Sequence, residues 1–94
     1  MESVSSAKNL VKRAANSVLR ADDLVSKLFD HLESSLDDLV IAQEHLDGRS
    51  TDLALNLLSR SKSNLARALE IADKIKSKIE SAIADISKIT EKAK

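Results

Sequence analysis

Apolar residues recur along this chain at alternating steps of three and four, on both sides of a single glycine, Gly48. Before it, the positions in this series are Val4, Ala7, Val11, Ala14, Val18, Ala21, Val25, Leu28, Leu32, Ser35, Leu39, Ala42 and Leu46. After it, they are Ala54, Leu58, Ser61, Leu65, Ala68, Ala72, Ile75, Ile79, Ala82, Ile86, Ile89 and Ala93. An average step of about 3.5 residues is typical of long helices that wind around each other in a left-handed supercoil. The pattern therefore predicts an all-α fold built from two long helices.

The break between the two series predicts how the helices are connected. We expect one domain over residues 1–94, with the first helix at about 4–46, a turn at 47–50 and the second helix at about 51–92. Gly48 is the residue that we expect in the left-handed conformation that often ends a helix, since glycine has no Cβ. Because the connection is short, the two helices are antiparallel neighbours and the chain is a helical hairpin.

The start of the second helix has residues suited to it. Ser50 or Thr51 is expected to cap its exposed amides, and Asp52 lies in its first turn, near the positive end of the helix dipole. Charge also favours the hairpin, because residues 30–47 carry a net charge of −6 and residues 49–69, which lie beside them, carry +3.

The register of the hairpin follows from the position of the turn. With the turn centred near residue 50, residues that face each other have numbers that add up to about 100. This register places Ser35 against Leu65 and Leu39 against Ser61, so that most layers match a large side chain with a small one. A register one heptad shorter matches nearly as many layers, so the register is open to within one heptad.

Further apolar residues flank the series, and we expect them to form an interface. They are Leu10, Leu24, Phe29, Leu36, Leu55, Leu57, Leu69, Ile71 and Ile83. Two helices joined by an alanine-rich contact bury little surface, and an exposed apolar patch marks an association site. We therefore expect a homodimer in which two hairpins form a four-helix bundle, with another helical protein as the alternative partner.

Composition restricts the classes of function. Net charge is zero, from 15 basic and 15 acidic residues, and aromatic residues make up 1% of the chain, so we expect no nucleic-acid partner. The chain has no cysteine for a disulfide or a thiolate site. Its longest apolar run, 39–42, is far shorter than the roughly 20 residues of a membrane-spanning helix. Residues 1–10 have no apolar core of a signal peptide, so a cytoplasmic location is expected, with signal-less secretion as the alternative.

The two histidines are the main candidates for chemistry. His31 and His45 are 14 residues apart, or about 21 Å along a helix, so they do not share a metal ion within one chain. No nucleophile with partner residues stands out from the sequence. We therefore expect no catalytic, cofactor or metal site, and a non-enzymatic module for protein–protein interaction or assembly.

Two short segments resemble known families. The segment FDHLESSLDDL (29–39) resembles the phospho-accepting histidine region of two-component dimerisation domains, although Leu32 stands where that family has an acid. This resemblance implies phosphotransfer on His31, with Asp30 or Glu33 as general base. Leu46-Asp47-Gly48 lies where small type VII secreted hairpins (WXG100-like) carry a Trp-x-Gly turn, which implies a secreted helical hairpin.

Overall fold

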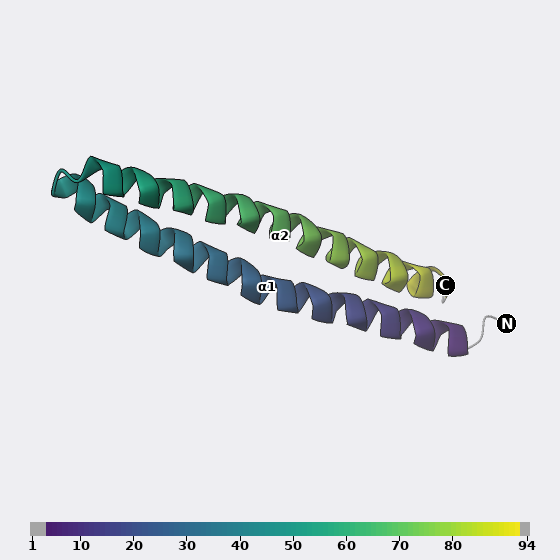
Figure 1. Cartoon of the computed structure of the whole chain (residues 1–94). Helices are drawn as coiled ribbons and strands as arrows, with labels where there is room; N and C mark the ends of the chain where they lie inside the picture. Colours follow the sequence, from purple (N-terminus) through teal and green to yellow (C-terminus); the bar gives the residue numbers. More distant parts are fainter. Residues whose placement is uncertain (1–3, 93–94) are drawn as a thin grey trace.

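The computed structural model describes residues 4–92 as two helices that run side by side in opposite directions (Figure 1). Helix α1 spans Val4–Asp47 and helix α2 spans Thr51–Lys92. The predicted all-α hairpin is confirmed, and the described part of the chain contains no strand. The molecule is a rod with extents of 72 × 15 × 15 Å, with the turn at one end and the start of α1 and the end of α2 at the other. Ala93, the last position of the predicted series, lies outside the described residues.

A Schellman motif ends α1, and its left-handed residue is Arg49. The amide of Ser50 donates to the carbonyl of His45 at 2.6 Å. The amide of Arg49 donates to the carbonyl of Leu46 at 3.0 Å. These are the two bonds that define the motif, with the left-handed residue at the position of Arg49. Its φ is 64°, whereas Gly48 has no positive φ.

The prediction that Gly48 is the left-handed residue is therefore wrong. Its amide donates to Glu44 at 3.0 Å, so it still continues the helical pattern. The physical reason lies in the start of α2, where the Ser50 carbonyl accepts the first helical bond, from Ala54 at 3.1 Å. Ser50 is thus the N-cap residue, and the chain reverses at the residue directly before it. Asp52 lies in the first turn of α2, as expected.

Small residues at every seventh position bring the two helices together. We call this set the inner row; its members are Ala7, Ala14, Ala21, Leu28, Ser35 and Ala42 in α1 and Ala54, Ser61, Ala68, Ile75, Ala82 and Ile89 in α2. Its alanines and serines from Ala14 to Ala82 are 0–6% exposed, and Ala7, Leu28, Ile75 and Ile89 are half-buried. Because the distance between packed helices depends on the side chains at the contact, a row of small residues allows a close approach.

The observed register differs from the predicted one. The interhelical pairs His31–Asn64, Ser35–Ser61, Asp38–Arg60 and Arg13–Asp85 have residue numbers that add up to 95, 96, 98 and 98. Ser35 therefore contacts Ser61, and not Leu65 as the matching of large with small side chains predicts. In this register Ala14 stands against Ala82 and Ala42 against Ala54, while Leu28 and Ile75 stand against alanines. The other large side chains of the 3–4 series lie to one side of the contact.

Candidate interaction surface

The hairpin has two different faces, which follow from the helical repeat. Relative to the inner row, a residue three positions later is turned by about 60° to one side, and a residue four positions later by about 40° to the other. His31, Asp38, Asn64 and Asp85 each follow an inner-row residue by three, and all four take part in contacts between the helices. Equivalent positions of α1 and α2 thus lie on the same face of the hairpin.

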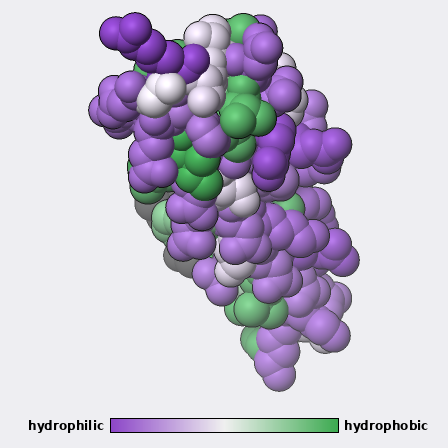
Figure 2. Space-filling view, turned by 60° about the vertical axis from the view of Figure 1, so that its left-hand side comes forward, coloured by the Kyte–Doolittle hydropathy of each residue, from purple (hydrophilic) through white to green (hydrophobic). Residues whose placement is uncertain are grey.

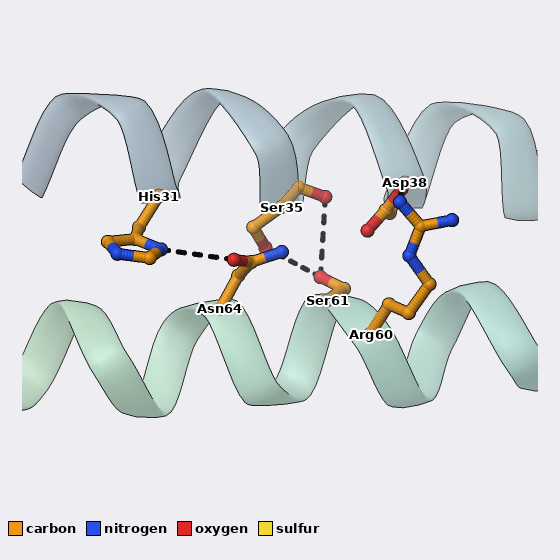
Figure 3. A network of polar contacts seen from close by, with 6 residues as sticks. All are labelled: His31, Ser35, Asp38, Arg60, Ser61 and Asn64. Carbon is orange, nitrogen blue, oxygen red and sulfur yellow. Dashed lines mark hydrogen bonds and ion pairs between the residues drawn. The ribbon is translucent and has the colours of Figure 1, made fainter. Parts of the chain in front are cut away.

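The face that carries these four residues is polar, and a network crosses it near the middle of α1 (Figure 3). His31 Nδ1 donates to Asn64 Oδ1 at 3.1 Å. One turn along, Ser35 Oγ and Ser61 Oγ form a buried hydrogen bond of 2.6 Å, and Ser61 Oγ also donates to the carbonyl of Ser35 at 3.3 Å. A buried hydroxyl without a partner costs free energy, so the two serines favour the register in which they meet.

Two buried aspartates lie on the same polar face, towards its two ends. Asp38 and Asp85 are about 95% buried, and each faces an arginine of the other helix. Arg60 Nη2 lies 3.7 Å from an Asp38 oxygen, and Arg13 Nη2 lies 3.5 Å from an Asp85 oxygen. Removing one partner of such a pair leaves an uncompensated charge, so these pairs oppose a sliding of one helix along the other.

Between these pairs the polar face carries further cations. Arg20 and Lys27 from α1 and Lys74 and Lys78 from α2 line a shallow pocket, whose wall also contains Asp23. Within residues 4–92, none of these four cations forms an ion pair. This face therefore presents charged and polar groups to solvent over its central part.

The opposite face is apolar. Residues four positions after the inner row form a second row: Val11, Val18, Val25, Leu32, Leu39 and Leu46 in α1, and Leu58, Leu65, Ala72, Ile79 and Ile86 in α2. Apart from the half-buried Val25 and the small Ala72, these side chains are 37–56% exposed. The sequence prediction placed this row in the contact between the two helices, and the structure corrects that, because within the 3–4 series only residues of the inner row are buried there. Figure 2 shows such apolar patches at the surface, among hydrophilic side chains.

An outer row extends the apolar face. It lies one position after the inner row and includes Phe29, Leu36, Leu55, Leu69 and Ile83, which are 57–71% exposed. We define the apolar face as the second row together with these five residues. Since no charged residue occurs in the second row, the centre of this face along the rod is free of charge.

The nine residues predicted to form an interface divide between the two faces. Phe29, Leu36, Leu55, Leu69 and Ile83 lie together on the apolar face. Leu10, Leu24, Leu57 and Ile71 follow the inner row by three, so they lie half-buried at the edge of the polar face. Sequence reasoning missed the second row, although one signal was present: alanine and serine dominate one position of the 3–4 series, and valine, leucine and isoleucine the other.

The histidines occupy ordinary helical positions. His31 is half-buried against Asn64, and neither Asp30 nor Glu33 hydrogen-bonds to it within the described residues. The carbonyl of His45 accepts the turn bond from Ser50, and its side chain is half-buried. Residues 4–92 contain no group of three histidine or acidic side chains placed to hold a metal ion.

Neither helix has, within the described residues, an apolar stretch long enough to cross a bilayer. Comparison with protein-family models, with curated proteins and with solved structures finds no match to this chain.

Proposed function

We propose that this protein is a non-enzymatic assembly module, in which the apolar face packs against the apolar face of a second copy to form a four-helix bundle. The observation that carries the proposal is the exposure, on one face of the hairpin, of the apolar second row together with five large apolar side chains of the outer row. An apolar face of this kind is favourable in water only when it is covered.

The size of the apolar face supports this proposal. Fourteen of its large side chains are 37–71% exposed, and Val25 is half-buried. Together these fourteen side chains expose on the order of 1,000 Å² of apolar surface. The largest apolar patch of an ordinary monomer measures about 300–600 Å², and a standard interface buries about 800 Å² on each partner. One hairpin thus exposes enough apolar surface for a complete interface.

The arrangement of the rows favours a second hairpin as the partner. In a four-helix bundle each helix contacts two neighbours, and the side chains between these two contacts fill the centre. The inner row already contacts the neighbour within the hairpin, so the second row, about 40° away, points to the centre of a bundle. A second copy supplies rows of the same length and spacing, whereas a different partner would have to match both.

The experiment compares two charged variants that leave the isolated hairpin intact. Leu69 is 71% exposed in the hairpin, so Leu69→Glu does not disturb the contact between α1 and α2. In the proposed dimer it places an unpaired carboxylate in the interface, which is costly. Ser63→Glu puts the same charge at an exposed site on the polar side of α2 and is the matched control.

Dissociation of the dimer is measured by sedimentation equilibrium for the original protein and both variants. We expect Leu69→Glu to raise the dissociation constant at least tenfold and Ser63→Glu to leave it within about threefold. Circular dichroism should show the helical content of the original protein in both variants. A dissociation constant that Leu69→Glu leaves unchanged would contradict the proposal. Association with a different helical protein, with this chain monomeric alone, would contradict the choice of partner.

A further inference from the structure

We infer that the two hairpins pack with their turns at the same end, around a two-fold axis that runs along the rod. This inference rests on the proposed function and specifies how the second copy binds. Two symmetric arrangements bring the apolar faces together. An axis along the rod places α1 against α2 of the partner, whereas an axis across the rod places α1 against α1 of the partner, in the opposite direction.

The outer row distinguishes these arrangements. Residues in this row are turned by about 100° from the contact within the hairpin, so they point towards the helix that lies on top. In α1 the positions of this row are Lys8, Ala15, Asp22, Phe29, Leu36 and Gln43, and in α2 they are Leu55, Lys62, Leu69, Lys76, Ile83 and Thr90. Since the row mixes apolar, acidic and basic residues, the wrong arrangement brings unlike residues together.

With the turns at the same end, facing residues stand at the same height along the rod. The observed register, with residue numbers that add up to 95–98, gives these heights. Phe29 then faces the partner's Leu69, and Ala15 faces the partner's Ile83. Asp22 faces the partner's Lys76, and every such pair occurs twice because of the two-fold axis. The acid meets a base, and Phe29, Leu69 and Ile83 meet apolar residues. Of the other large apolar residues of the row, Leu36 stands at the height of the partner's Lys62 and Leu55 at that of the partner's Gln43.

A second charged pair follows from the same register. Glu33 lies on the outer side of the apolar face, five positions after the inner row, and Lys62 of the outer row stands at its height. In the same-end arrangement Glu33 is close to the partner's Lys62. Charges at the rim of an interface contribute little affinity, but they select one orientation over another.

With the turns at opposite ends, Leu36 faces the partner's Ala15, but three other large apolar residues of the outer row face charges. Full overlap of the two rods places the axis near the middle of α1, so Phe29 faces the partner's Asp22. On the other side, Leu69 faces the partner's Lys76, and Ile83 faces the partner's Lys62. Charges placed against large apolar side chains lose water without gaining a partner, so this arrangement is less favourable.

The same-end arrangement gives the assembly two different ends. Both turns lie at one end of the bundle, and the terminal ends of all four helices lie at the other, as the start of α1 and the end of α2 in one hairpin indicate (Figure 1). The module therefore holds two chains side by side in the same direction, with any segments joined to them leaving from the same end.

Cysteine cross-linking tests the arrangement, since the protein has no cysteine of its own. Chains with Phe29→Cys are unfolded, mixed with chains carrying Leu69→Cys, refolded and oxidised. The matched control mixes Ala15→Cys with Leu36→Cys chains, whose cysteines face each other only when the turns lie at opposite ends. We expect disulfide-linked heterodimers from the first mixture, at several times the yield of the second.

The outcomes separate this inference from the proposed function. A higher yield from the Ala15→Cys and Leu36→Cys mixture, or no cross-link in either mixture of a dimeric protein, overturns the same-end arrangement and leaves the dimer standing. A monomeric mass for the protein without cysteines overturns the proposed dimer itself.

Discussion

Two substitutions in the turn test which residue, Gly48 or Arg49, has the left-handed conformation. Arg49 has a φ of 64°, in the left-handed region. An L-residue there is disfavoured by about 1–2 kcal/mol, whereas glycine adopts this conformation freely. Arg49→Gly removes that cost but adds about 0.5–1 kcal/mol for the greater freedom of glycine in the unfolded chain. We expect the free energy of unfolding to rise by about 0.5–1 kcal/mol.

The neighbouring substitution, Gly48→Ala, is expected to stabilise as well. A Cβ at Gly48 would lie 3.5 Å from the Glu44 carbonyl oxygen and 3.7 Å from that of His45, which are ordinary van der Waals contacts. Since Gly48 has no positive φ, alanine fits its backbone without strain. Alanine also reduces the freedom of the unfolded chain, which corresponds to a gain of about 0.4–1 kcal/mol.

Both variants are compared with the original protein by thermal and urea denaturation, followed by circular dichroism. All samples have the same chain concentration, because association adds to the apparent stability. A gain of 1 kcal/mol raises the melting temperature of a chain of this size by about 4–8 °C. If Gly48→Ala instead loses 1 kcal/mol or more while Arg49→Gly changes nothing, Gly48 is the left-handed residue and the description of the turn is wrong.

The polar face gives two further predictions. Ser61→Ala leaves the buried Ser35 hydroxyl without its 2.6 Å partner and should cost about 1–3 kcal/mol, whereas the double variant with Ser35→Ala should be close to neutral by urea denaturation; a double variant as unstable as the single one would contradict this reasoning. Arg60→Gln leaves the buried Asp38 unpaired and should cost about 1–2 kcal/mol, while Arg67→Gln, which breaks no ion pair, should cost less than about 0.5 kcal/mol. If Arg60→Gln and Arg67→Gln lower the free energy of unfolding equally, the ion pair between Arg60 and Asp38 does not contribute to stability.

The helical fold was predictable from the sequence because its signal is periodic and long. The chain has no proline, and its single glycine lies between the two halves of the series. The segment 50–52 that follows has the residues of a helix start. The turn was harder, because the left-handed residue depends on where the cap of α2 lies and not only on where glycine stands. Arginine at that position gives no local signal.

The division of the apolar series into two rows could not be predicted from its spacing alone. Steps of three and four place both rows near the contact, and only packing decides which row is buried there. Because Ala and Ser occupy one row, the helices approach until Ser35 meets Ser61, and residues such as Leu32 and Leu65 are left outside. Of the predicted interface residues, Leu69 lies on the exposed apolar face and Leu24 does not, since they stand on opposite sides of the inner row.

The central claim is that the apolar face is covered by a second copy of the chain. The most direct test is the molar mass of the original protein in solution, measured by light scattering over a hundredfold range of concentration. The account predicts a constant mass of twice the 10.2 kDa of the chain. A mass that stays at 10.2 kDa over the whole range would contradict it.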